Sequence, residues 1–208
     1  MFRRIRIYRK IKSRKYTEAL ALLPSDDTIT ESELNFRAHC FFRSMQYDKA
    51  RQDWDRLKET KYAYVAFNNQ GYMYLEQGLW DKAIIELTRA REMQPKFAFP
   101  LNNLGYAYLM TDRIEEGVEM IEKSLKLDKY NYYAVRNIGI YYMLKKQYGD
   151  ALVVLNKAKA KDKAIDDMDV YIAICQSKNG DNDLFSNMVQ QFSDHERIRL
   201  DSLIQLFP

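Results

Sequence analysis

The sequence predicts an all-α protein built as a solenoid, a stack of repeated helix-turn-helix units. Gly71, Gly105 and Gly139 recur at intervals of thirty-four residues, within the similar segments FNNQGYMYL, LNNLGYAYL and RNIGIYYML. Apolar residues around them recur every three or four positions, which is the spacing of one helix face. The chain also has only seven glycines and four prolines. A unit of this length cannot bury its apolar face alone, so successive units must stack on one another.

The clearest unit covers residues 64–97. Its first helix carries Phe67, Gly71 and Tyr74 on one face, and its second carries Ala83, Leu87 and Ala90. Because Gly71 and Ala83 are small, the two helices can approach to the short end of the roughly 8–10 Å interaxial range. Gly78 lies in the turn between the helices, and Pro95 ends the second one.

This pattern of a bulky residue, Gly, Tyr, Ala, a bulky residue, Ala and Pro resembles the tetratricopeptide repeat. The next two copies carry Leu104, Gly105, Tyr108, Gly117 and Ile121, and then Ile138, Gly139, Tyr142, Ala151 and Leu155, with Lys129 and Lys163 in place of the proline. The resemblance implies a right-handed superhelix whose first helices line a concave groove.

The flanking segments complete one solenoid domain over residues 1–208. Upstream, Leu34, Ala38, Ala50 and Trp54 predict one more repeat, which begins at a capping box of Thr30 and Glu33. Downstream the pattern weakens, as expected for a terminal repeat, and Ser193 with Glu196 predicts a final capping helix. The predicted segments are a degenerate helical pair at 1–30, repeats at 31–63, 64–97, 98–131 and 132–165, a degenerate repeat at 166–192 and the capping helix at 193–208.

The composition is that of a soluble chain, 47% hydrophobic and 30% charged. No apolar run approaches the roughly 18 residues typical of a membrane span, and no signal peptide is recognised, so we expect a cytoplasmic protein. Cys40 and Cys175 each lie within a helical pattern. They are expected to be small buried hydrophobes rather than a disulfide.

Positive charge is concentrated at the amino terminus. Residues 1–16 hold eight Lys and Arg and no acid, whereas residues 17–208 carry 25 basic and 29 acidic side chains. One interpretation is a contact with nucleic acid or another anionic surface. The other is a solvated cap, in which Phe2, Ile5, Ile7, Tyr8 and Ile11 form an apolar side that docks on Leu20 and Leu23.

No catalytic, metal or cofactor motif is present in the sequence. His39 and His195, the only histidines, have no nucleophile at helical spacing and lie in no metal-ligand pattern. There is no glycine-rich phosphate loop, no Cys-x-x-Cys and no G-x-S-x-G. We therefore expect no enzyme activity, no cofactor and no bound metal.

The candidate binding residues lie on the first helices. Equivalent positions, four residues apart, are occupied by Asn35 and His39, Asn68 and Tyr72, Asn102 and Tyr106, and Arg136 and Ile140. Amides can bond a peptide backbone, and tyrosines offer apolar contact with a polar tip. This row is expected to line one continuous groove that binds a segment of another protein, with Tyr72, Tyr106 and Arg136 as anchors.

A structural role is the alternative for several of these side chains. The resemblance implies that Asn69, Asn103 and Asn137 pack between repeats and that Tyr74, Tyr108 and Tyr142 belong to the core. Asn68, Tyr72, Asn102 and Tyr106 can be explained either way. On the groove interpretation, Asn102→Ala should be nearly silent, whereas Gly105→Leu should overpack the helix contact.

The predicted function is a non-catalytic protein-interaction module, such as an adaptor, an assembly factor or a dedicated inhibitor of the immunity type. Relatives that bind the acidic tails of chaperones use lysines on the inner face, and those places hold Asn35, Asn68 and Tyr133 here. A chaperone-tail partner is therefore disfavoured. Nucleic-acid or anionic-surface association through residues 1–16 remains the alternative.

Overall fold

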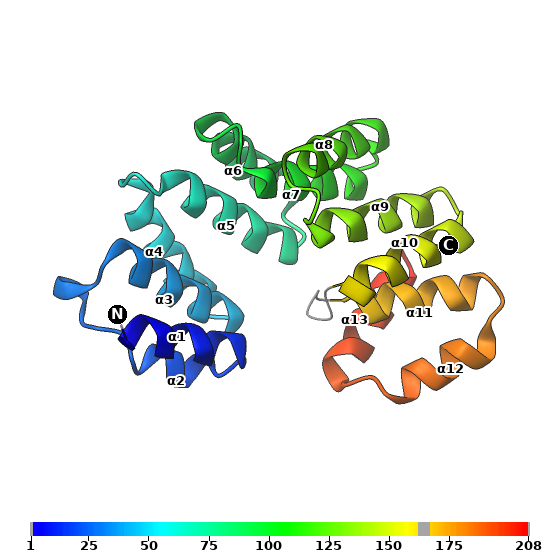
Figure 1. Ribbon diagram of the computed structural model, residues 1–208, viewed down its shortest axis with the longest axis horizontal. Coiled ribbons are helices and arrows are strands. Elements are labelled where there is room, and N and C mark those ends of the chain that lie inside the picture. The colour runs from blue at the N-terminus through cyan, green and yellow to red at the C-terminus, as the bar shows by residue number, and fades with distance from the viewer. Residues whose placement is uncertain (1, 162–166, 208) are drawn as a thin grey trace. The chain divides into compact units, whose positions relative to one another are not determined.

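The computed structural model describes residues 2–161 and 167–207, and the side chain of every one of these except His195 (Figure 1). Lys163, which takes the place of the terminal proline, lies outside the described residues. Within them there is no strand. The elements are α1 (Phe2–Lys12), α2 (Tyr16–Leu20), the 3-10 helix η1 (Asp26–Thr28), α3 (Glu31–Arg43), α4 (Tyr47–Lys58), α5 (Ala63–Glu76), α6 (Trp80–Met93), α7 (Ala98–Met110), α8 (Ile114–Leu127), α9 (Tyr132–Leu144), α10 (Tyr148–Lys161), α11 (Met168–Lys178), α12 (Asn182–Gln190) and α13 (Asp194–Ile204).

The chain divides into two compact units, Met1–Asn103 and Leu104–Pro208, with the division inside α7. The single domain over 1–208 therefore stays a prediction. The helix pairs lie within the predicted repeat segments, except that α5 begins one residue earlier, at Ala63.

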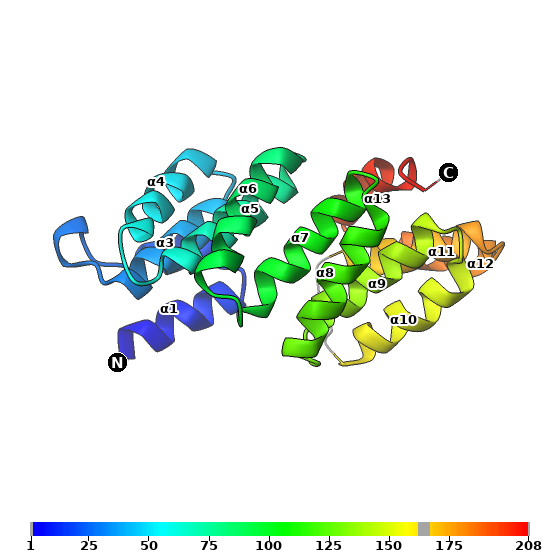
Figure 2. The ribbon, with the colours of Figure 1, turned by 90° about the horizontal axis from the view of Figure 1, so that it is seen from above.

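In the first unit, α1 and α2 form the short helical pair that the sequence predicts, and α1 lies beside α3 (Figure 2). Only part of the predicted docking is present. Ile7 is fully buried and Ile11 is half-buried, but Phe2, Ile5 and Tyr8 are exposed. Residues at intervals of three turn progressively around a helix, so they cannot all reach the one side that α2 and α3 cover.

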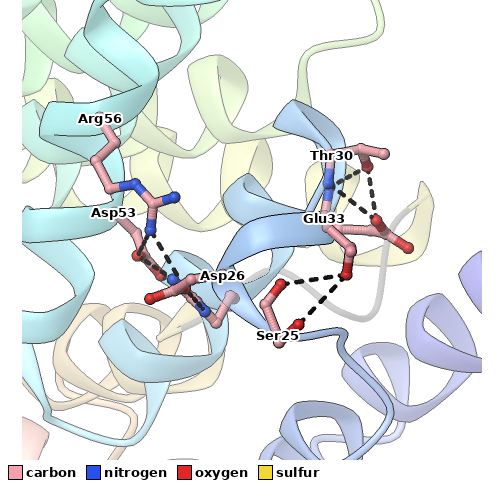
Figure 3. Close-up of polar contacts among 8 residues, drawn as sticks. Ser25, Asp26, Thr30, Glu33, Asp53 and Arg56 are labelled. Atoms are coloured by element: carbon pink, nitrogen blue, oxygen red, sulfur yellow. Dashed lines mark hydrogen bonds and ion pairs between the residues drawn. The ribbon is translucent and has the colours of Figure 1, made fainter.

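The start of α3 is fixed by the predicted capping box. The Glu33 amide donates to the Thr30 hydroxyl oxygen, and the Thr30 amide donates to Oε2 of Glu33 (Figure 3). Glu33 is 1% exposed, and its Oε1 also accepts from Nε and Nη2 of Arg3 at 3.0 and 2.7 Å. One carboxylate therefore caps α3 and holds α1 against it.

A second polar cluster, not predicted from sequence, ties η1 to α3 and α4. Arg37 donates to both carboxylate oxygens of the buried Asp53, each at 2.7 Å, and to Asp26 at 2.5 Å. Arg56 approaches the same Asp26 at 3.3 Å (Figure 3). The two carboxylates hold the Arg37 proton more tightly and raise its pKa.

Glycines allow the two helices of a pair to pack closely, as the repeat pattern predicts. A Cβ at Gly71 would lie 2.6 Å from the Leu87 side chain, and one at Gly139 would lie 2.6 Å from that of Leu155. At Gly105 a Cβ would lie 2.5 Å from Ile121 and 2.8 Å from the carbonyl oxygen of Gly117. These distances are shorter than normal Cβ contacts, so any other residue would force neighbouring atoms to shift, and the spacing of the glycines reflects close helix contact.

Each unit has its own core. In the first unit it is formed by α3, α4 and α5, with Trp54 and Leu57 almost fully buried. In the second it runs from the end of α7 to α13 and includes Tyr171, whose ring meets Phe207 edge to face at 6.4 Å. The rings of Tyr74, Tyr108 and Tyr142, expected in the core, are half-buried.

The predicted capping helix is present as α13. Its capping box of Ser193 and Glu196 forms as expected, and Leu200 and Leu203 are buried where α13 packs on α11. Arg199 donates through Nε and Nη2 to Oδ2 of Asp167 at 3.0 and 2.7 Å. The helix thus covers α11 with its apolar side and is held by this ion pair.

Candidate functional site

The predicted asparagines form a hydrogen-bonded row inside the first unit. Asn69 Nδ2 donates to Asn35 Oδ1 at 3.0 Å, and Asn103 Nδ2 donates to Asn68 Oδ1 at 3.1 Å, so each bond joins successive first helices. Within a helix, Asn68 donates to Asn69 and Asn102 donates to Asn103. We call Asn35, Asn68, Asn69, Asn102 and Asn103 the asparagine ladder.

The asparagine ladder is structural. Asn68 and Asn102 are buried, and Asn35 also accepts a bond from the indole Nε1 of Trp54 at 3.1 Å. Amide groups engaged in this way satisfy one another away from water. These bonds agree with the packing role expected for Asn69 and Asn103, and Asn35, Asn68 and Asn102 take part in them as well.

An aromatic group lies on the same side of α3 and α5. The ring of Phe42, which is buried, meets His39 at 6.3 Å and Tyr72 at 5.8 Å, both edge to face. His39 and Tyr72 are half-buried. The repeat pattern points to these two residues but not to Phe42, which holds their rings and lies three residues after His39. Part of each ring is left at the surface.

In the second unit, Arg136 lies among tyrosines. Its guanidinium carbon is 5.6 to 6.0 Å from the ring centres of Tyr106, Tyr133 and Tyr171, within cation–π range. Its Nε and Nη2 also donate to Asn137 Oδ1 at 3.2 and 3.1 Å. Burial raises the pKa of Tyr171 well above its usual value, helped by a hydrogen bond with Tyr106 and opposed by the Arg136 charge.

This placement changes the roles expected for two residues. Arg136 is buried at 9% exposure and Ile140 is fully buried. The tyrosines cover the guanidinium, and Ile140 belongs to the core of the second unit. Neither side chain offers a binding surface in this structure, whereas Tyr106 stays half-buried. Tyr171 was not predicted, although it lies thirty-four residues after Asn137 and so continues the period of Asn69 and Asn103.

Several basic side chains of the amino-terminal segment are engaged in contacts within the protein. Arg3 pairs with Glu33, Arg4 donates to Ser32 at 2.6 Å, and Lys10 and Lys15 both approach Glu18. The side chains of Arg6, Arg9 and Lys12 are exposed. Within the described part of the chain, no ion pair with an acidic side chain engages this second group, so it is the better placed to meet another molecule.

The described residues offer no arrangement for metal binding, since no three His, Cys, Asp or Glu side chains gather there. Cys40 and Cys175 are both buried, and burial raises their pKa to about 11 and about 12. Such thiols are poor nucleophiles at neutral pH. None of the helices in the described part of the chain is both long and apolar enough to cross a bilayer.

The sequence matches no protein-family model and no curated protein. Solved structures do match. A thermophilic TPR protein of Thermus thermophilus, TTC0263, aligns over 85% of this chain and all of its own, with a TM-score of 0.69 and 16% identity. PilW, a type IV pilus biogenesis factor, covers 96% of this chain and 97% of its own, with a TM-score of 0.67 and 16% identity. Cut9, in an APC/C hetero-tetramer with Hcn1, covers 81% of this chain but 33% of its own, with a TM-score of 0.64 and 16% identity.

Proposed function

We propose that this chain, which has the fold of tetratricopeptide-repeat proteins, is a non-catalytic module that binds a segment of another protein. The binding residues are the half-buried aromatic side chains of the first helices. In the first unit these are His39 and Tyr72, and in the second it is Tyr106. Each unit offers its own binding surface.

The observation that carries this proposal is the arrangement around Phe42. His39 and Tyr72 occupy equivalent positions on α3 and α5, and both rings rest edge to face on the same buried ring. Aromatic side chains that are held by packing and stay partly exposed lose little conformational freedom on binding. They can therefore act as anchors for an apolar side chain of a partner.

The asparagine ladder also favours the aromatic side chains as the binding residues, because its own amides are already engaged. Its amides bond to one another and to Trp54, so breaking them to reach a peptide backbone would cost free energy. The partner should be recognised by apolar and aromatic contact more than by amide bonding. A terminal carboxylate held by a clamp is also disfavoured, since Asn35 and Asn68 stand at two of the clamp positions and belong to the ladder.

The solved relatives support a role in assembly. One is described as a pilus biogenesis factor and another is part of a hetero-tetramer. Each description belongs to that protein. For this chain they favour an adaptor or assembly factor, and a dedicated inhibitor of another protein fits the same surface.

The experiment is a pull-down from a native lysate, with and without nuclease, followed by calorimetry with the recovered partner. Tyr72→Ala and Tyr106→Ala are tested separately, and each anchor should lose at least about 1 kcal/mol of binding free energy, roughly fivefold in Kd. Tyr130→Ala is the matched control, because Tyr130 is 65% exposed and lies at the end of a repeat. If both variants bind as tightly as the control, the proposal is wrong and the partner uses another face.

A further inference from the structure

We propose that the outer face of α1 docks on membranes that contain anionic lipids. This surface is separate from the aromatic positions of the first helices, and the inference does not depend on partner binding there. It selects lipid over nucleic acid as the anionic surface that residues 1–16 meet.

Three apolar side chains point to solvent from α1. Phe2 is 84% exposed, Ile5 is 40% exposed and Tyr8 is 50% exposed. They follow one another at intervals of three residues, so they form a row that winds gradually along the side of α1 away from α2 and α3. The opposite side of α1 holds the buried Ile7 and the Arg3 side chain that meets Glu33, so docking on the protein leaves the apolar row uncovered.

A basic row runs beside the apolar one. Arg6, Arg9 and Lys12 are exposed, and each follows an apolar residue of the first row by four positions, which places the two side by side on a helix. The Nζ of Lys12 lies 5.7 Å from the ring centre of Tyr8, in agreement with this placement. No acidic residue occurs in α1, and Glu18 of α2 is engaged by Lys10 and Lys15.

The combination of the two rows fits a bilayer surface. A helix lying in the plane of the headgroups buries apolar side chains among the upper acyl chains, while Arg and Lys reach back to the phosphates. Tyr8 has the apolar ring and polar tip that suit the headgroup level. Single-stranded nucleic acid would use the aromatic rings for stacking, but it offers no apolar phase to receive Ile5.

The test is co-sedimentation of the full chain with vesicles of phosphatidylcholine alone and of phosphatidylcholine with about one third phosphatidylserine, which models an anionic leaflet. The parent should bind the anionic vesicles and not the neutral ones. Arg6→Gln/Arg9→Gln/Lys12→Gln should weaken partitioning on the order of 100-fold. Phe2→Ser/Ile5→Ser should weaken it at least about tenfold, because burial of the apolar row is lost.

A second triple variant, Lys96→Gln/Lys145→Gln/Lys157→Gln, is the matched control, since it makes the same change in net charge at exposed lysines elsewhere. It should partition within about twofold of the parent, as expected for charges away from the contact. An equal loss in this control would mean that net charge alone drives binding. A parent that binds single-stranded poly-uridine but not the vesicles, or one whose vesicle binding survives Phe2→Ser/Ile5→Ser, would also overturn the inference.

Discussion

The side-chain amide of Asn103 donates a hydrogen bond to the side-chain oxygen of Asn68 at 3.1 Å, across two successive first helices. The same bond joins Asn69 to Asn35 one repeat earlier. The sequence predicts Asn35 as a binding residue and leaves Asn68 open to either role, while the family resemblance implies packing for Asn69 and Asn103. The structure assigns them to packing, and this changes which substitutions should affect stability.

Asn68→Ala should lower the free energy of unfolding by about 1–3 kcal/mol, since it removes the acceptor of the Asn103 side-chain amide and the donor to the Asn69 side-chain oxygen. Asn102→Ala, expected from sequence to be nearly silent, should also be destabilising, because Asn102 is 2% exposed and donates to Asn103. Urea unfolding measures both. The control is Asn156→Ala on the exposed side of α10, and equal midpoints for all three variants would argue against a stabilising ladder.

Gly105→Ala should destabilise by about 1–3 kcal/mol through overpacking, because the new Cβ would lie 2.8 Å from the carbonyl oxygen of Gly117. Gly149→Ala is its matched control. No atom lies within 4 Å of a Cβ at Gly149, so this change should stabilise by about 0.4–1 kcal/mol by restricting the unfolded chain. Opposite shifts in Tm are expected, and shifts of the same sign would contradict the repeat contact.

Arg136→Ala should lower Tm as well as any binding. The side chain is buried among three tyrosine rings and donates to Asn137, so its removal should cost about 1–3 kcal/mol. Arg51→Ala, at an exposed ion pair with Asp48, should stay within about 0.5 kcal/mol of the parent. A melting curve for Arg136→Ala that overlays the parent would restore the original expectation of an anchor at the surface.

The protein should lose stability at acidic pH because the Glu33 carboxylate becomes protonated. Burial raises the pKa of this carboxyl, but the bonds from Thr30 and the contact with Arg3 outweigh burial and leave the pKa below its ordinary value of 4.5. The unfolded chain then binds the proton first as pH decreases, so this contribution is complete above pH 4.5 and is lost as pH falls through the folded-state pKa.

Urea unfolding of the parent and of Glu33→Gln at several pH values measures this contribution. Glu33→Gln should be less stable at neutral pH and should show a shallower loss between about pH 5 and pH 3. Parallel curves for the two proteins would show that Glu33 has the same pKa in the folded and unfolded states.

The helical hairpins could be predicted because their determinants are local. The apolar spacing around Gly71, Gly105 and Gly139 and the two capping boxes each involve residues a few positions apart, and the interval between the glycines is a property of the sequence alone. Periodicity and capping act over a few turns of helix, so they can be recognised without knowledge of the tertiary contacts between helices. The exposure of a side chain has no such local signal.

The helices, the repeat period and the small residues at the helix contacts thus follow from the amino-acid order alone. Three-dimensional packing was needed to establish that Asn68, Asn102, Arg136 and Ile140 are buried, while Tyr72 and Tyr106 keep part of their rings at the surface. The physical reason is that burial depends on neighbours from other helices. Arg136 of α9 is enclosed because Tyr106 and Tyr171 come from α7 and α11, and Phe2 is exposed because α2 and α3 cover only the opposite side of α1.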